Sequence, residues 1–287
     1  MKIERVAIEI EKELENILAD SRGNQFFRAA LEKTRSPEEF LGVLVNYVKY
    51  ANLFASRIAG FVRVITAREG LFFDHTQSIL GERNTEVAGY VLEALFDEFG
   101  DRSLPDHPNH IALSWATVIG ASQYFRVDPT ILRSSLFFLH DRDRRSIYFC
   151  GLGDFIVKLT RGYCLGFWAP FNHSIMRGIG FHFASESLAT GEFDALQDFM
   201  ERRYPDLVTY LKNTQVTIQE KLCPAYHWIQ VHAGQGGVEV EHAGAALEAV
   251  RSTIAYSDKE DIKRPEELIL AGAKNFSEIH EAFMENV

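Results

Sequence analysis

Apolar residues recur at helical spacing along most of the chain. Residues 3–20 are one example, because a single helical face would collect Val6, Ile8, Ile10, Leu14, Ile17 and Leu18. Ser36-Pro37-Glu38-Glu39 marks another helix start, with Ser as N-cap, Pro in the first position and Glu completing a capping box. The helix that opens there can extend to about Arg68.

Further start and stop signals follow along the chain. We predict one helix from Asn84-Thr85-Glu86 to about Glu98-Phe99-Gly100, a second from His110 to Gln123, and a short third helix that begins at Asp128-Pro129-Thr130. Further helices are predicted over 146–166, 171–189, 191–202, 205–222 and 225–255, and a last helix begins at Arg264-Pro265. No alternating strand pattern of useful length is found. The sequence therefore predicts an all-α fold, as one domain (1–287) of seven or more helices. Residues 1–20 and 258–287 could be appended helices.

Composition and charge narrow the class of protein. The net charge is −10 with no basic block, which argues against a nucleic-acid or anionic-membrane partner. Three cysteines, at 150, 164 and 223, are too few for a disulfide framework. No secretory signal and no run of membrane-spanning length occur. We therefore expect a soluble cytoplasmic protein, in which the charged run at 141–145 is a solvated face or turn.

The segment from His232 to His242 carries the most distinctive chemistry. His232, Glu239 and His242 stand at offsets of 0, 7 and 10 residues, which fall within about 80° of one another on a continuous helix. Glu239 and His242 form an E-x-x-H step, a spacing with which two side chains can bind one ion. Imidazole and carboxylate ligands suit iron, manganese or zinc. The step also occurs by chance on solvated helix faces, so other helices must supply further ligands.

Two other places combine acids or histidines with apolar helical surroundings. Glu98 ends one predicted helix and His110 begins the next, so a helix–turn–helix can bring them together. His182 and Glu186 are four residues apart in an apolar helix, where an unpaired carboxylate would be costly. Its partner could be a metal or an Arg, but Arg177 lies about 180° away on that helix. A second E-x-x-H is not found, which disfavours the ferritin-like plan.

The order of these pieces resembles the heme-oxygenase-like diiron oxidases and oxygenases (TenA/PqqC-like fold) over residues 24–255. The matching pieces are the helix pair around Ser36-Pro37-Glu38, Glu98-Phe99-Gly100-Asp101 through His110-Ile111-Ala112-Leu113, Glu186 on a small-residue helix, and the His232, Glu239 and His242 segment. The family's common last motif is H-x-x-x-D-x-x-H, whereas Gln235 and Glu239 stand at two of its positions here. The first His would be displaced to His232, across glycines that could unwind the helix. His227 or His173 could be the missing imidazole instead.

The resemblance implies a non-heme diiron enzyme. Glu98, His110 and Glu186 would bind one Fe(II), and His232, Glu239 and His242 the other, with one bridging carboxylate. The second site can be labile, and O₂ would be the co-substrate. The expected substrates are small carboxylates, such as amino acids or fatty acids, undergoing N-oxygenation, desaturation or oxidative C–C cleavage in specialised metabolism.

The same comparison suggests what else the site would need. Arg161 and Arg177 are candidates to hold a substrate carboxylate, although an Arg in an apolar helix more often extends to solvent. Tyr47, Tyr50 and Tyr163 could line the pocket or serve as core. A homodimer is the common default for such a chain.

The same sequence features are compatible with alternative functional hypotheses. A thiaminase-type hydrolase would need Cys164 as nucleophile, with an acid nearby. A metal-free enzyme of the same fold would use the histidines as acid–base groups, and a heme protein would need only one axial His. In a non-catalytic helical interaction protein, the His and Glu residues would lie on the surface.

Overall fold

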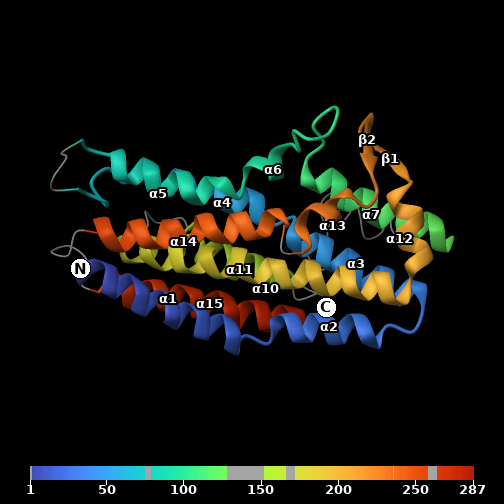
Figure 1. Cartoon of the computed structure of the whole chain (residues 1–287), viewed down its shortest axis with the longest axis horizontal. Helices are drawn as coiled ribbons and strands as arrows, with labels where there is room; N and C mark the ends of the chain where they lie inside the picture. Colours follow the sequence, from blue (N-terminus) through green and yellow to red (C-terminus); the bar gives the residue numbers. More distant parts are fainter. Residues whose placement is uncertain (1, 75–78, 128–151, 166–171, 235, 258–263) are drawn as a thin grey trace.

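The longest described helix, α11, runs through the middle of the molecule (Figure 1), and more than half of its residues are buried. The computed structural model describes residues 2–74, 79–127, 152–165, 172–234, 236–257 and 264–287. Its elements are α1 (Lys2–Asp20), α2 (Gly23–Lys33), α3 (Pro37–Ala51), α4 (Phe54–Thr66), α5 (Glu82–Glu93), α6 (Phe96–Phe99), α7 (His110–Phe125), α10 (Leu152–Gly162), α11 (Asn172–Arg203), α12 (Pro205–Lys212), β1 (Gln215–Ile218), β2 (Lys221–Pro224), α13 (His227–His232), α14 (Val238–Tyr256) and α15 (Pro265–Met284).

The predicted all-α class with seven or more helices is confirmed for the described part of the chain. No helix among the described residues is long and apolar enough to cross a membrane. The helix predicted at 128–130, the charged run at 141–145 and Cys150 lie outside the described residues. Of the predicted helix over 146–166, the described part contains α10.

Helices pack around α11 on two sides. α14 lies along it and contacts α5, which in turn contacts α4, while α15 and α2 cover another face (Figure 1). Close packing against α15 depends on two glycines: a Cβ on Gly180 would lie 1.9 Å from the carbonyl oxygen of Ile269, and one on Gly272 would lie 1.9 Å from that of Arg177. The backbones of α11 and α15 therefore approach each other directly.

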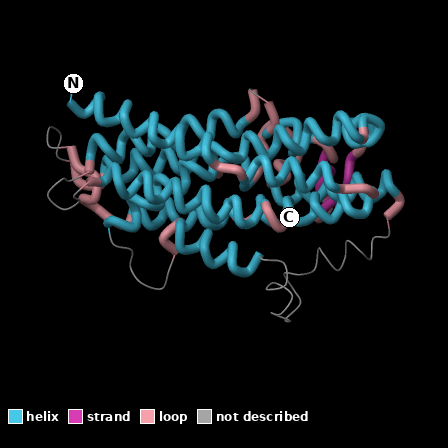
Figure 2. The backbone as a smooth tube through the Cα atoms, turned by 90° about the horizontal axis from the view of Figure 1, so that it is seen from below, coloured by secondary structure: helices cyan, strands magenta, loops and turns pink. Residues whose placement is uncertain are grey.

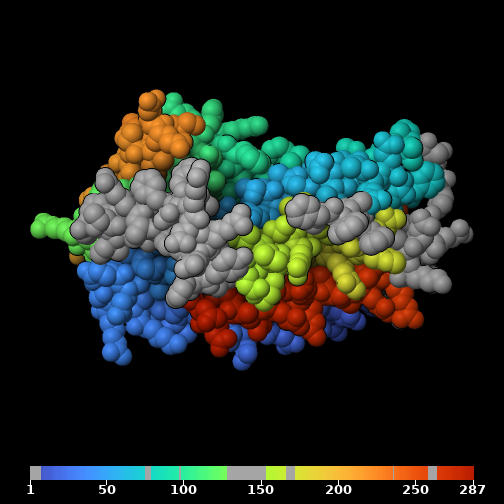
Figure 3. Space-filling model, turned by 180° about the vertical axis from the view of Figure 1, so that it is seen from behind, coloured from blue at the N-terminus to red at the C-terminus, as the bar shows by residue number. Residues whose placement is uncertain are grey.

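The terminal helices belong to this same packing. α1 contacts α15, α11 and α14, and α15 contacts α1, α2, α10 and α11. In the space-filling view, α10 lies over the red surface of α15 (Figure 3). The two segments expected as possible appendages thus contribute buried side chains to the core, including Leu14, Phe276 and His280.

A β-hairpin at one end of the helical body was not predicted (Figure 2). The predicted helix over 205–222 ends at Lys212, and β1 pairs antiparallel with β2, with Val216 opposite Cys223. Gln219 and Glu220 form the turn with φ of 47° and 70°. Two-residue turns of this left-handed kind usually carry Asn-Gly or Asp-Gly, so this one gives no sequence signal.

Several helix boundaries also differ from the prediction. The helix predicted from Pro37 to Arg68 is broken at Asn52-Leu53, where the Asn52 side chain hydrogen-bonds to Ser114 of α7 (Nδ2–Oγ 3.2 Å). The helices predicted over 171–189 and 191–202 form the single helix α11, because buried side chains on both sides of the expected break outweigh the cost of about 1 kcal/mol of the glycine at 191. The helix predicted from Asn84 begins at Glu82 and ends at Glu93, before the short α6.

The helix starts predicted at Ser36 and at Asn84 have different outcomes. The N-cap at Ser36 is confirmed, because its Oγ accepts a hydrogen bond from the Glu39 backbone N–H at 3.3 Å. Asn84 is instead buried inside α5, where its Nδ2 donates to the carbonyl of Ile65 at 3.1 Å and its Oδ1 accepts from the Phe72 N–H at 3.3 Å. Asn84 therefore anchors the chain that leaves α4.

Candidate metal centre

All six predicted metal ligands line one pocket. Glu98 comes from α6, His110 begins α7, Glu186 lies in the middle of α11, His232 ends α13, and Glu239 and His242 lie in the first turns of α14. Five of them are buried, and the side chain of Glu98 is 19% exposed. Residues far apart in the sequence thus meet at one place in the interior.

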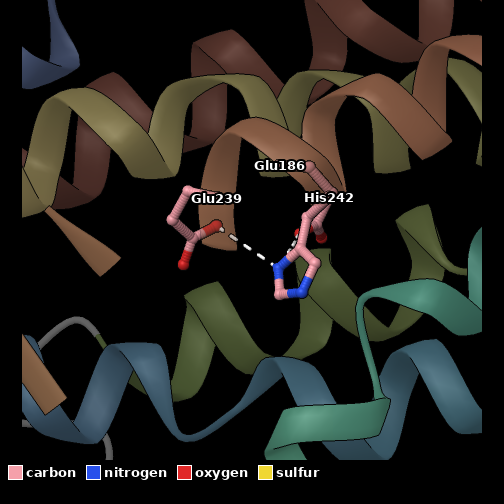
Figure 4. A group of neighbouring side chains, drawn as sticks. All are labelled: Glu186, Glu239 and His242. Carbon is pink, nitrogen blue, oxygen red and sulfur yellow. Dashed lines mark ion pairs between the residues drawn. The ribbon is translucent and has the colours of Figure 1, made fainter. Parts of the chain in front are cut away.

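The tightest group consists of Glu186, Glu239 and His242 (Figure 4). One ligand atom from each lies within 4.8 Å of the others. His242 Nδ1 is 3.9 Å from Glu186 Oε2 and 3.7 Å from Glu239 Oε2. The E-x-x-H step therefore places its two side chains together, and Glu186 from α11 joins them. Two carboxylates and one imidazole from two helices therefore meet in the interior.

His232 reaches the pocket in a different way from the one predicted. The chain between α13 and α14 breaks at Gly234, with φ of 85°, so His232 and Glu239 do not share one continuous helix. The unwinding that the glycines suggested is confirmed. His232 Nε2 nevertheless lies 3.7 Å from Glu239 Oε1.

The ring orientation of His232 suits a metal ligand. Its Nδ1 is 2.5 Å from the carbonyl oxygen of Trp228, which can only accept, so Nδ1 carries the proton. The lone pair of the neutral ring is then on Nε2, which faces Glu239. This arrangement, with one ring nitrogen donating to a backbone carbonyl, is typical of metal-binding histidines.

Glu98 and His110 meet across the predicted helix–turn–helix. His110 Nδ1 is 3.2 Å from Glu98 Oε1, and its ring centroid is 4.5 Å from that of His232. Asn109 caps α7 by accepting a hydrogen bond from the Ala112 N–H at 2.9 Å, which fixes His110 at the first position of the helix. The pair lies beside His232, so the site continues from the group of Figure 4 toward α7.

The two alternative histidines are located elsewhere. His227 Nε2 pairs with Asp101 Oδ2 at 2.6 Å, which links α13 to the segment between α6 and α7. His173 is exposed near the start of α11. Of the three candidates, His232 is the one that lines the pocket.

Burial and mutual repulsion set the charges of this site. Burial raises the pKa of Glu186 to about 8, and the charge of Glu239 adds to the rise. Burial also raises the pKa of Glu239. The pKa of His232 falls well below its usual value because of burial and the neighbouring His110. Ionised carboxylates buried in this pocket without a nearby cation would therefore destabilise the folded protein.

The side chains present fit a metal. Imidazole nitrogens and carboxylate oxygens are the ligands of iron, manganese and zinc. Among the described residues, no Lys or Arg lines this pocket, and His242 is a lining residue whose charge partly offsets those of Glu186 and Glu239. Divalent ions would supply further positive charge.

Glu192 and His280 were not predicted as site residues, whereas His182 was noted in the sequence for its spacing from Glu186. Glu192 also lines the pocket, and its Oε1 accepts a hydrogen bond from the Tyr50 hydroxyl at 3.0 Å and pairs with His280 Nε2 at 2.8 Å. His182 Nδ1 lies 3.4 Å from Glu186 Oε1, and burial lowers the pKa of His182 to about 3. Glu192 lies six residues after Glu186 and His280 comes from the last helix, so no local spacing links them.

The candidate substrate-binding residues divide into two groups. Arg161 and Arg177 are exposed on α10 and α11 and are not brought to the pocket. Tyr47 and Tyr50 do line it. Tyr163 is buried outside the pocket lining, with its hydroxyl 2.8 Å from that of Ser185.

Cys164 does not have the surroundings of a nucleophile. Its thiol donates to the carbonyl oxygen of Ser174 at 2.8 Å, and burial raises its pKa to about 12. A catalytic thiol needs a lowered pKa and access to substrate. Cys164 also does not line the pocket.

Comparison with models of known protein families gives no match, and comparison with curated proteins gives none either.

Proposed function

We propose that this chain is a non-heme diiron enzyme that activates O₂, an oxidase or oxygenase. The observation that carries the proposal is the convergence of three histidines and three glutamates, from five helices, on one pocket. A dinuclear site needs about this many protein ligands, and helical bundles build such sites from facing helices. The resemblance to heme-oxygenase-like diiron proteins supplies the choice of iron.

Each part of the pocket has a task under this proposal. Glu186, which lies beside both His242 of the E-x-x-H step and His182, would help to hold the ions. Mixed carboxylate and imidazole ligation leaves coordination positions open, and two ferrous ions, when bound, supply electrons for the reduction of O₂. The aromatic side chains of Tyr47, Phe193 and Trp228 form part of the pocket wall, where they would exclude water and orient a substrate.

The competing functions have less support. A non-catalytic interaction protein would carry these His and Glu residues on its surface, whereas five of the six are buried. A heme protein would need one axial histidine, which does not explain the three glutamates of the set. A Cys164 nucleophile is disfavoured by its raised pKa. A small organic acid, such as an amino acid or a fatty acid, stays the expected substrate class, through N-oxygenation, desaturation or C–C cleavage.

The decisive experiment is an anaerobic Fe(II) titration with metal analysis, followed by exposure to O₂. We expect close to two irons per chain and O₂ consumption. Glu239→Gln should lower the iron content by about one ion or more, because the amide loses the anionic oxygens that bind the metal. Glu241→Gln, two residues away and exposed, is the matched control and should keep the full content.

Fewer than one iron in the wild-type protein, with no O₂ consumed, would refute the proposal. Equal iron contents in the two variants would show that Glu239 is not a ligand.

A further inference from the structure

Glu192 is the acidic residue of the pocket that the six-ligand set leaves unused. Its side chain is 3% exposed, the contacts from Tyr50 and His280 engage the same oxygen, Oε1, and the Tyr47 hydroxyl also interacts with this carboxylate. An ionised carboxylate can accept about four hydrogen bonds. Glu192 therefore keeps acceptor capacity for a ligand in the pocket.

The contacts of Glu192 hold it in place. Tyr50 comes from α3 and His280 from α15, so two helices fix the carboxylate of a third. The Tyr50 ring stacks on Phe283 with centroids 4.8 Å apart, and the His280 ring stacks on Phe276 at 5.7 Å. The carboxylate is thus positioned before any ligand arrives.

The wall beside Glu192 is aromatic. Tyr47, Tyr50, Phe54, Phe193 and Trp228 all line the pocket. The faces of such rings attract cations, most strongly where water is excluded. The Tyr47 hydroxyl is buried there beside the Glu192 carboxylate, so an ammonium group bound by Glu192 would also meet this hydroxyl.

Lys and Arg side chains are missing from the described lining of the same surroundings. Neither this pocket nor the neighbouring surface pocket, which shares His242 with it, has a Lys or Arg among its described lining residues. The surface pocket instead contains Glu93, Glu241 and Glu248. A substrate carboxylate would find no Lys or Arg among these described lining residues, whereas an ammonium group would find a carboxylate and aromatic rings.

We propose that Glu192 and the aromatic side chains around it bind the protonated amino group of the substrate. The inference rests on the proposed function, because it places the substrate in the metal pocket. It narrows the expected substrates to amines and amino acids and disfavours fatty acids.

The test measures ligand binding to Fe(II)-loaded protein in the absence of O₂. Binding is monitored by tryptophan fluorescence, since Trp228 lines the pocket. The probes are hexylammonium, hexanol and hexanoate, compared at equal ionic strength. We expect hexylammonium to bind most tightly and Glu192→Gln to weaken it about tenfold or more, a loss of about 1.4 kcal/mol. The same variant should leave hexanol binding unchanged.

Two further variants keep the test sharp. Glu201→Gln removes an exposed carboxylate of the same helix and should bind hexylammonium like the wild type. Tyr47→Phe removes one hydroxyl from the wall and should weaken hexylammonium binding by a smaller factor. Tyr47→Phe keeps the test decisive even if Glu192→Gln unfolds the protein.

Each outcome decides a separate question. Tighter binding of hexanoate, or hexylammonium binding unaffected by both Glu192→Gln and Tyr47→Phe, would overturn the inference. Loss of iron in folded Glu192→Gln would also overturn it, because Glu192 would then be a metal ligand. Glu192-dependent amine binding by a protein that consumes no O₂ would support the inference while refuting the proposed oxidase.

Discussion

Glu186 carries its carboxyl group in the interior, within reach of a second carboxyl group and two imidazoles. Burial raises the pKa of Glu186 from its ordinary value of 4.5 to about 8. Between these two pH values the folded, metal-free protein keeps a proton on Glu186 that the unfolded chain has released. The free energy of unfolding therefore depends on pH.

The sign of this linkage can be worked out. An acid with a raised pKa makes the folded state less stable as the pH rises from 4.5 to about 8. His182 and His232 have lowered pKa values and act in the opposite direction, but only up to their ordinary value of 6.5. Between pH 6.5 and 8, the contribution of Glu186, which lowers stability as the pH rises, is no longer opposed by these two histidines.

We therefore predict that the unfolding free energy of the metal-free protein falls as the pH rises from 6.5 to 8, by at most about 1.4 kcal/mol per pH unit for each proton. Urea unfolding at several pH values measures it. Glu186→Gln should flatten the slope, and saturating Fe(II) should reverse it because metal and proton compete for the carboxylates. A rising stability in the metal-free wild type would contradict the prediction.

Local spacing is what made some residues of the site predictable. Glu239 and His242 are one helical turn apart, and Glu98 and His110 flank a turn, so their proximity follows from the sequence. Glu192 and His280 meet because α15 packs on α11. That packing depends on tertiary contacts that no local pattern encodes.

At the scale of elements, the break between α13 and α14 positions two ligands. Gly237 begins α14 as its N-cap, and a Cβ there would lie 2.5 Å from the backbone carbonyl oxygen of His232. The two helices can therefore turn sharply, with His232 facing Glu239. The glycines that made the sequence motif irregular are part of the site's geometry.

Gly237→Ala should destabilise the protein by about 1–3 kcal/mol, the usual cost of overpacking, and lower its iron content by displacing His232. Gly244→Ala is the matched control in the same helix, where an added Cβ meets nothing within 4 Å. That control should be neutral or stabilising by up to about 1 kcal/mol. Thermal unfolding and metal analysis of both variants check the prediction, which fails if Gly237→Ala keeps wild-type iron and stability.

The prediction of elements was limited by the same dependence on context. Capping at Ser36 and the helix starts at His110 and Pro265 rely on the residues at those positions, and the structure has them. The hairpin after α12 and the break at Asn52 depend on contacts with α7 instead. Neither has a distinctive local signature.

For the whole molecule, the contact between α11 and α15 joins the core to the pocket. The glycines at 180 and 272 permit that contact, and the same interface brings His280 to Glu192. Disturbing it should affect both stability and the amine subsite.

Gly272→Ala should cost about 1–3 kcal/mol or more, because its Cβ would overlap the carbonyl of Arg177 and the helices must separate. Gly42→Ala, in α3 with nothing within 4 Å of an added Cβ, is the control and should not destabilise. Chemical denaturation compares the two. Equal stabilities would show that the α11–α15 approach is looser than described.

The convergence of five helices on one pocket also affects how metal supply acts on the protein. Of the six proposed ligands, Glu239 and His242 are the pair joined within one helix, so the denatured chain would lack the assembled site and bind the ions weakly. Under the proposed function, metal would favour the native state by mass action, adding about 2.7 kcal/mol when its free concentration is a hundred times the dissociation constant. A cell short of the metal would then hold more unfolded chain for its proteases, so the abundance of this protein would follow the supply of the proposed cofactor.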